Sequence, residues 1–213
     1  MHTLYGSQGS GSAAVEAALT MCGLPHRIVS AASWDPASAL AELARANPLL
    51  QIPTLVLPDG TVLTESAAIL IHLGLEFPAS GLLPKDAARR GQAIRGLVFI
   101  ASNCYAAIGV IDYPERWCDG ATAAMKERIR RGARARLHRY WEIFADVFAT
   151  PGPFFGGTAP GALDLLAAVV SKWSGARAHL REARPQLSAL LERIDAHPRV
   201  EAVFARHWPD LQK

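Results

Sequence analysis

A short segment rich in proline, glycine and serine, residues 78–84, divides the chain into two parts with different patterns. Before it, short runs with β-strand character alternate with runs of helical periodicity. After it, the strand signals disappear and the 3.6-residue periodicity of helices continues. Alternating strands and helices are typical of an α/β layer structure, whereas a succession of helices is typical of an all-α domain. The sequence therefore predicts two domains, an α/β domain over residues 1–78 and an all-helical domain over residues 86–213.

The first part is predicted to contain the order strand, helix, strand, helix, strand, strand, helix. Gly23 and Pro25 mark the end of the first helix, and Pro58-Asp59-Gly60 predicts a tight turn between the last two strands. The elements are expected at residues 2–5, 13–22, 26–31, 36–46, 54–57, 61–64 and 66–77. Helices of the second part are expected near residues 86–112, 120–149, 160–174, 185–197 and 199–207.

The bulk composition limits the class of protein. Half of the 213 residues are apolar, 19% are charged, and the net charge is only +3. Such a chain can bury a core without disulfides or a structural metal. The three cysteines form no CxxC pair and have no zinc-ligand spacing, which favours a reducing compartment and predicts no metal site.

The N-terminus lacks the basic flank and apolar run of a signal peptide, and the apolar stretches are judged too short or too interrupted to span a bilayer. We therefore expect a cytoplasmic protein that does not insert into a membrane. A basic run between Lys126 and Arg139 suggests nucleic-acid binding. An apolar face runs through the same stretch, however, so a solvated helix face is the preferred interpretation and no nucleic-acid partner is expected.

The loop 6–12, Gly-Ser-Gln-Gly-Ser-Gly-Ser, lies between the first predicted strand and helix. A helix N-terminus has free N–H groups and a partial positive charge, so it stabilises an anion or a thiolate. Glycines allow close approach to the backbone, and serine hydroxyls add donors. The alternative interpretation is a flexible turn with a serine cap for the helix. Its glycine spacing matches neither nucleotide-binding fingerprint.

Two further short motifs have both a structural and a functional interpretation. Pro53, just before a predicted strand, is either an ordinary trans edge proline or a cis proline that leaves the peptide groups of Ile52 free for a peptide-like ligand. Glu65 and Ser66 begin an apolar helix. They either cap it or receive an α-amino group and its carboxylate.

Taken together, these features resemble the glutathione transferase superfamily over nearly the whole chain. The resemblance is carried by the runs 51–55, 59–60 and 65–70, which look like the glutathione-binding signature of that family. Residues 157–165, with Asp164, resemble its helix-capping motif. The resemblance implies a thioredoxin-like N-terminal domain and an all-helical C-terminal domain.

The resemblance also implies roles for particular residues. Pro53 would be cis, Ile52 would pair with the cysteinyl backbone of glutathione, and Gln51 would help to hold its glycyl end. Glu65 and Ser66 would hold the γ-glutamyl group. The family's catalytic residue lies in the first loop, where this chain has neither tyrosine nor cysteine, so Ser10 is the first candidate and Ser12 the second. Where many members carry glycine, this chain has Leu50.

In the family, the first helix of the second domain faces glutathione and forms the pocket for an electrophile. The residues in this region that suit such a pocket are Asn103, Tyr105, Tyr113 and Trp117. Aromatic walls suit planar apolar substrates. Packing in the protein core is the alternative for these side chains.

The sequence thus predicts a glutathione transferase that ionises the glutathione thiol and adds it to a small hydrophobic electrophile. Glutathione would be the co-substrate, no metal would be needed, and a homodimer with a detoxification role is expected by resemblance. The alternatives are a non-catalytic glutathione-transferase-like binding module and a glutathione-dependent peroxidase.

Overall fold

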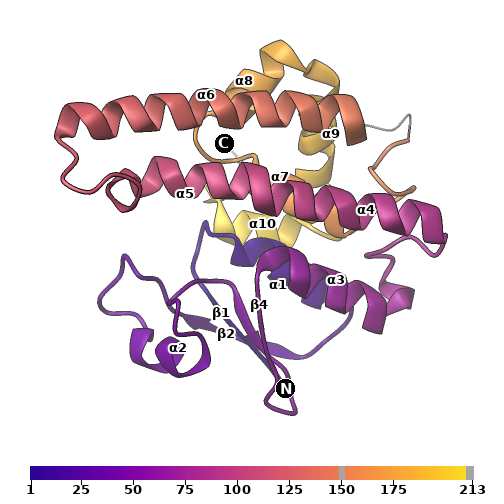
Figure 1. Cartoon of the computed structure of the whole chain (residues 1–213). Coiled ribbons are helices and arrows are strands. Elements are labelled where there is room, and N and C mark those ends of the chain that lie inside the picture. The colour runs from indigo at the N-terminus through magenta and orange to yellow at the C-terminus, as the bar shows by residue number, and fades with distance from the viewer. Residues whose placement is uncertain (149–151, 210–213) are drawn as a thin grey trace.

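The change of pattern after residue 78 corresponds to a change of architecture in the computed structural model, which describes residues 1–148 and 152–209 (Figure 1). The end of the helix expected over 120–149 and the last four residues of the chain lie outside the described residues. The elements of the first part are β1 (His2–Gly6), α1 (Ser12–Met21), β2 (His26–Ser30), α2 (Leu40–Ala46), β3 (Thr54–Val56), β4 (Val62–Thr64) and α3 (Ser66–Glu76).

The described residues of the second part form helices and helical turns. In chain order they are η1 (Pro78–Ser80), α4 (Ala87–Phe99), the π-helical turn η2 (Ile100–Tyr105), α5 (Ala106–Asp112), η3 (Pro114–Arg116), α6 (Ala123–Phe148), α7 (Ala162–Val170), α8 (Ala176–Ala183), α9 (Pro185–Asp195) and α10 (Glu201–His207). The expected α/β plus all-helical fold class is confirmed, with a thioredoxin-like first part.

The four strands form one mixed sheet in the order β2-β1-β3-β4. β1 is parallel to β2, and β3 is antiparallel to both of its neighbours. Thr54 stands opposite Tyr5 on one side and Thr64 on the other. This register brings the end of β1, the start of β3 and the end of β4 to one edge of the sheet, so the three loops of the predicted motifs meet there.

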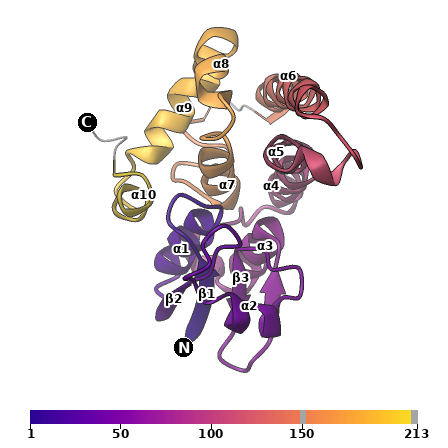
Figure 2. The ribbon, with the colours of Figure 1, turned by 90° about the vertical axis from the view of Figure 1, so that its left-hand side faces the viewer.

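Alternation along β1 builds a core on each face of the sheet, because successive strand side chains point to opposite faces. Leu4 is fully buried in the main core with α1 and α3, which lie between the sheet and the C-terminal helices (Figure 2). Tyr5 packs in a second core with Ala31, which follows β2, and with Leu43 of α2. Its hydroxyl donates to Glu42 at 2.7 Å. Tyr5 is therefore a buried core residue.

Helix α7 joins the two parts of the molecule. It contacts α1 and α3 of the first part and α4 and α9 of the second, and all of its residues are buried. Its start is capped by Asp164, whose carboxylate accepts from the N–H groups of Gly161 at 2.9 Å and Phe155 at 3.1 Å. Burial raises the pKa of Asp164 to about 7, against the opposite effect of these two hydrogen bonds. The sequence motif around Asp164 thus forms the expected helix cap.

Two helices differ from the sequence predictions. α2 begins at Leu40 rather than near residue 36, because Ser38 and Asp35 hydrogen-bond to nearby backbone groups and hold the chain in turns. α8 was not predicted. It is separated from α7 by Ser174 and Gly175, both with positive φ, and it buries only Ala176 and Leu180. α8 is only eight residues long and largely polar, so it does not stand out as an apolar run although its few apolar residues lie on one face.

The expectation about bilayer-spanning length was wrong. α4, η2 and α5 form one helical run, Ala87–Asp112, with a mean hydropathy of 1.7 in its most apolar window, which is long and apolar enough to cross a membrane. In this fold the run packs along α6 and against α7. Length and composition alone do not assign the run to a bilayer.

Candidate active site

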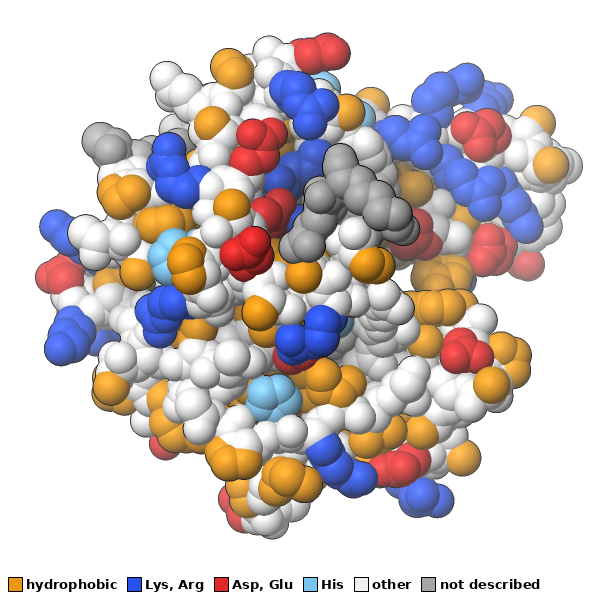
Figure 3. All heavy atoms as spheres, turned by 180° about the vertical axis from the view of Figure 1, so that it is seen from behind, with side chains coloured by type: hydrophobic (Ala, Val, Ile, Leu, Met, Phe, Trp, Pro, Cys, Tyr) orange, Lys and Arg blue, Asp and Glu red, His pale blue; other side chains and the backbone are white. Residues whose placement is uncertain are grey.

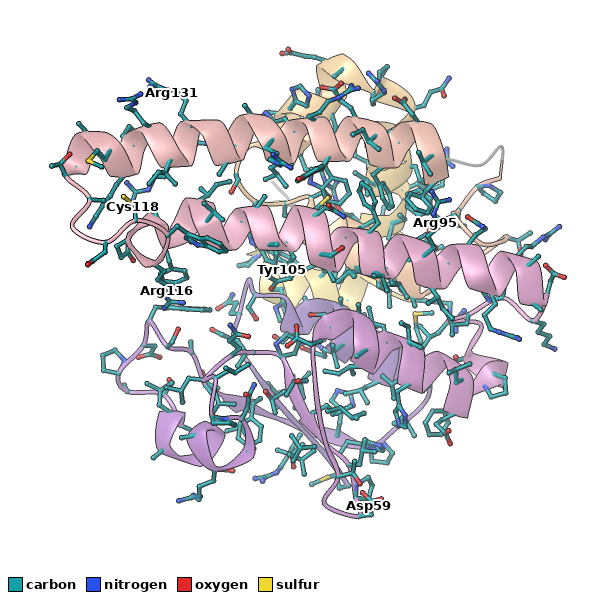
Figure 4. The ribbon with its side chains drawn as sticks, viewed as in Figure 1. Asp59, Arg95, Tyr105, Arg116, Cys118 and Arg131 are labelled. Carbon is teal, nitrogen blue, oxygen red and sulfur yellow. The ribbon has the colours of Figure 1, made fainter. Side chains whose placement is uncertain are left out.

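A cavity of about 980 Å³ lies between the sheet edge and the helical part. One wall consists of residues 9–11, 49–53 and 64–67, which are the three loops that the sheet register brings together. The other wall consists of residues between 101 and 117, with Trp173 (Figure 4). A cleft of this size with a few polar groups is typical of a small-molecule site.

The loop after β1 is organised by its own serines. The Ser10 hydroxyl donates to the carbonyl of Ser7 at 2.7 Å, and Ser10 and Ser12 share a hydrogen bond of 2.8 Å between their hydroxyls. Ser12 also faces Gly6, where an added Cβ would lie 2.5 Å from the Ser12 side chain. Ser10 lines the cavity, whereas the almost fully buried Ser12 does not.

The N-terminus of α1 opens into the cavity. Gly11 is the N-cap and supplies no side-chain cap, while the N–H of Ser12 donates to the Ser10 hydroxyl at 3.3 Å. The N–H of Gly11 donates to no group among the described residues. It is therefore free to bind an anion at the positive end of the helix dipole.

The last helix holds this loop in place, a contact that sequence analysis missed. The N–H of Gly9 donates to Nδ1 of His207 at 3.2 Å, and Nε2 of His207 donates to the Glu16 carboxylate at 2.8 Å. Arg206 also pairs with Glu16, which is buried inside α1. Burial by itself would raise the pKa of Glu16, but the hydrogen bonds from His207 and Arg206 outweigh it and lower that pKa.

The segment before β3, residues 49–53, lines the same cavity as the N-terminus of α1. The Ile52–Pro53 peptide bond is cis, and Ile52 makes no backbone hydrogen bond among the described residues. The segment is fixed from behind by the buried Asn47, whose amide donates to the carbonyl of Gln51 at 3.1 Å and to the hydroxyl of Thr54 at 3.0 Å. Nothing in the local pattern had assigned this positioning role to Asn47.

Leu50 has a φ of 54°, the left-handed conformation that glycine adopts most readily. This explains why glycine is common at the corresponding position of the family that the sequence resembles. Leu50 itself lines the cavity with an exposed side chain.

Glu65 and Ser66 stand at the N-terminus of α3 and line the cavity. Glu65 is the N-cap with a φ of 64°, a conformation that non-glycine residues adopt rarely, and it forms no side-chain cap. Among the described residues, neither side chain has a hydrogen-bond or ion-pair partner. The capping alternative is therefore not what these two polar groups do in the structure.

The helical wall contains three of the four expected aromatic or polar residues. Tyr105, Tyr113 and Trp117 line the cavity. Asn103 does not line it, because its amide turns back along the helix and donates to the carbonyl of Phe99 at 3.0 Å. The π-helical turn around residues 100–105 sets this orientation, which a regular helical period did not predict.

The residues of the cavity that were not expected from the sequence include Trp34, Asp112 and Arg116. Trp34 and Trp117 are 60% and 64% exposed, so large aromatic surfaces from both walls reach the solvent. The Arg116 guanidinium lies 4.0 Å from the centre of the Tyr113 ring, and Figure 4 shows it pointing toward the N-terminal part. Burial raises the pKa of Asp112, with Arg130 acting in the opposite direction.

The three cysteines and the basic run between Lys126 and Arg139 lie outside the cavity. Burial raises the pKa of the thiols of Cys22 and Cys104, so neither is activated. The basic run is the N-terminal half of α6, where arginines gather on the exposed surface (Figure 3). Within residues 1–148 and 152–209, no cluster of histidine, cysteine or acidic side chains has the arrangement of a metal site.

A mixed sheet whose loops meet an all-helical part around such a cleft defines a thioredoxin-like domain joined to a helical domain. The sequence model of the glutathione S-transferase N-terminal domain matches residues 12–75. The uncharacterized GST-like protein YncG of Escherichia coli is 27% identical over 97% of this chain and 98% of its own.

Solved structures agree with this class. A glutathione transferase homologue from Sulfitobacter with bound glutathione superposes with a TM-score of 0.80, at 24% identity over 95% of this chain and 96% of that one. A glutathione transferase from Methylococcus capsulatus has a TM-score of 0.76, at 26% identity over 96% and 97% of the two chains. The chain therefore has the fold of the glutathione transferases, and it is similar to glutathione S-transferase-like proteins over nearly its whole length.

Proposed function

We propose that this protein binds glutathione at the junction of its two parts, lowers the pKa of the bound thiol, and joins the sulfur to a small hydrophobic electrophile. The observation that carries the proposal is one cavity that combines the open N-terminus of α1, the free peptide groups of Ile52 and the unpartnered side chains of Glu65 and Ser66. Each of these groups matches a different part of a γ-glutamyl tripeptide.

In this arrangement, the Glu65 carboxylate receives the α-amino group of glutathione and the Ser66 hydroxyl donates to its α-carboxylate. These are charge-assisted contacts, which are about twice as strong as neutral hydrogen bonds. Ile52 pairs with the cysteinyl backbone in the manner of an added strand, and Gln51 holds the glycyl end. The thiol then points to the tip of α1.

The tip of α1 favours the thiolate over the thiol. Gly11 offers a free N–H, and Ser10 is the hydroxyl of this loop that faces the cavity. A fall of one unit in the thiol pKa raises the thiolate population near neutral pH by up to about tenfold. Holding the thiolate beside an electrophile adds the advantage of proximity and orientation.

The part of the cavity beyond the thiol is lined by Tyr113, Trp117 and Trp34. Flat aromatic walls suit a planar apolar electrophile. In a substitution reaction, the thiolate forms a carbon–sulfur bond while the leaving group departs with its bonding electron pair. No metal is needed for this step, because the nucleophile is generated by ionisation of the thiol.

Retention on immobilised glutathione, combined with conjugation of chlorodinitrobenzene, tests the proposal. We expect retention and release of chloride with formation of the conjugate. Retention without turnover would support the non-catalytic binding module. Reduction of cumene hydroperoxide without conjugation would support a glutathione peroxidase, and failure to be retained would contradict all three.

We further propose that residues 1–78 and 86–213 are the two domains, and that the active form is a cytoplasmic homodimer with a role in detoxification. The exposed apolar face of α3 supports the homodimer.

A further inference from the structure

We infer that the hydroxyl of Tyr105, from the helical part of the chain, is the hydrogen-bond donor to the glutathione thiolate, in place of a serine of the first loop. This inference rests on the proposed function, because it names the group that would stabilise the sulfur in the same cavity. Three observations carry it. The loop serines already donate hydrogen bonds within the loop, Tyr105 lies over the N-terminus of α1, and the Tyr105 hydroxyl has no hydrogen-bond partner among the described residues.

The loop serines already use their hydroxyl protons. The Ser10 hydroxyl donates to the Ser7 carbonyl at 2.7 Å, and the Ser12 hydroxyl is 3.2 Å from the same carbonyl. Their hydroxyl oxygens lie 2.8 Å apart. A hydroxyl has a single proton to donate. Ser10 can therefore donate to sulfur only if the loop gives up a short hydrogen bond that holds its shape.

Tyr105 stands directly over the tip of α1. A Cβ atom added at Gly11 would overlap the Tyr105 hydroxyl oxygen and would lie 3.3 and 3.4 Å from two carbons of its ring. Only the absence of a side chain at Gly11 lets the hydroxyl reach this point. Figure 4 shows Tyr105 at the junction between its own helical run and the N-terminal elements.

The Tyr105 hydroxyl has no hydrogen-bond partner among the described residues, and Tyr105 lines the cavity. Its ring is held edge-on against Trp173, with ring centres 5.6 Å apart. The free N–H of Gly11 lies at the same place. The two donors, one from each part of the molecule, together form a pocket for one anion.

Tyr105 keeps its proton at neutral pH chiefly because it is buried. Burial, with smaller contributions from Asp112 and Glu65, raises the pKa of Tyr105 to about 12. At neutral pH the tyrosine therefore donates a hydrogen bond and keeps its own proton. When glutathione ionises, the S–H bond breaks and the proton passes to water, while Tyr105 stabilises the remaining thiolate.

The test is the pKa of bound glutathione, followed through the ultraviolet absorbance of the thiolate. Tyr105→Phe removes only a hydroxyl that has no protein partner, so the fold is kept. We expect the thiol pKa to rise by about one to two units, since a hydrogen bond to a charged group has this strength. Chlorodinitrobenzene conjugation near neutral pH should fall by about ten- to a hundredfold. Binding of S-methylglutathione, which has no ionisable thiol, should stay unchanged.

Two other single variants complete the comparison. Tyr140→Phe deletes the same atom from a tyrosine of α6 whose hydroxyl accepts from Arg136 outside the cavity, and it should leave the thiol pKa unchanged. Ser10→Ala should disturb the loop and glutathione affinity without raising the thiol pKa as Tyr105→Phe does. A thiol pKa that rises in Ser10→Ala and not in Tyr105→Phe would overturn the assignment and return the role to Ser10.

Gly11→Ala provides a second way to displace the hydroxyl. Its φ of −60° accepts alanine, so the added methyl group acts on Tyr105 and not on the backbone. We expect Gly11→Ala to raise the thiol pKa, and the double variant with Tyr105→Phe to raise it no further. Fully additive shifts would overturn the inference. Failure of the unmodified protein to bind S-methylglutathione would instead contradict the proposed function and, with it, this assignment.

Discussion

At the scale of single residues, Ser66 is the clearest test of the glutathione cradle. Ser66 is a buried residue that lines the cavity, and its hydroxyl has no partner among the described residues. In Ser66→Ala, the α-carboxylate of glutathione loses one charge-assisted hydrogen bond, a loss of about 1.5–3 kcal/mol. We expect the dissociation constant for glutathione to rise between about tenfold and a hundredfold, measured by isothermal titration calorimetry.

Ser102→Ala is the matched control for that experiment. The Ser102 hydroxyl donates to the carbonyl of Val98 at 2.7 Å on the exposed side of the helical run, and it does not line the cavity. The same atom is deleted, so glutathione affinity should not change. Equal affinities for Ser66→Ala and the unmodified protein would contradict the placement of the γ-glutamyl group at α3.

At the scale of elements, the contact between α10 and the first loop predicts a pH dependence of stability. Glu16 is buried, and its pKa in the folded state is lowered below the ordinary 4.5 by His207 and Arg206, despite the opposing effect of burial. A carboxylate with a depressed folded pKa contributes stability above its unfolded pKa. That contribution is lost as the pH falls through the folded pKa.

We therefore expect Glu16→Gln to lower the free energy of unfolding by about 1–3 kcal/mol at neutral pH. The difference between the variant and the unmodified protein should shrink as the pH falls below 4.5, which urea unfolding at a series of pH values would measure. Glu182→Gln, at an exposed site of α8 with no ion pair among the described residues, should show neither effect. A constant difference from pH 7 to pH 3 would mean that Glu16 does not titrate as inferred.

Two helical glycines predict opposite effects of the same substitution. A Cβ at Gly74 of α3 would lie 2.5 and 2.9 Å from side-chain carbons of the buried Leu83, whereas a Cβ at Gly91 of α4 would meet nothing within 4 Å. Overpacking at Gly74→Ala should lower the free energy of unfolding by about 1–3 kcal/mol. Gly91→Ala should raise it by about 0.5–1 kcal/mol through better helix propensity. Thermal unfolding of both variants is the measurement, and a shared sign would contradict the packing at Leu83.

Sequence patterns predicted correctly the elements whose ends are set by nearby glycine, proline or turn residues. Gly23 has a positive φ after α1, as its C-terminal position suggested, and the turn at Asp59-Gly60 joins β3 to β4. Local patterns failed where side chains or neighbouring elements decide. Ser38 shortens α2 by capturing backbone groups, and a π-helical turn rotates Asn103 away from the cavity. Neither effect produces a periodic pattern of apolar residues in the sequence.

At the scale of the whole molecule, the local patterns of the sequence indicated the loops of the site, whereas the residues that face them were expected only from the family resemblance. The loops ending at Ser10, Ile52 and Ser66 meet because their strands share one sheet edge, which strand order alone suggests. The approach of Tyr105 to Gly11 depends on how α7 joins the two parts, a contact between residues almost a hundred positions apart. Long-range packing of this kind leaves no mark on either segment alone.

An apolar face of α3 is exposed on the surface of the single chain. Ala68, Ile71, His72 and Leu75 recur at helical spacing on the side of α3 away from its buried residues, and Leu75 is 53% exposed. Val62 of β4 and Val98 of α4 are also 40% and 51% exposed. In the run Ala87–Asp112, only 33% of the most apolar window is buried. Exposed apolar patches mark interaction surfaces, and we propose that this one is a subunit interface.

Leu75→Glu tests whether that face is the dimer contact. In a two-fold symmetric interface each copy presents the same patch, so one substitution places two carboxylates in one apolar contact. Burying them without partners is unfavourable enough to separate the subunits. We expect a dimeric mass for the unmodified protein and a monomeric mass for the variant in light scattering after gel filtration. Val147→Glu, which alters an exposed valine of α6 away from this face, should remain a dimer. A dimer that survives Leu75→Glu but not Val147→Glu would move the interface to α6, and a monomeric unmodified protein would contradict the homodimer altogether.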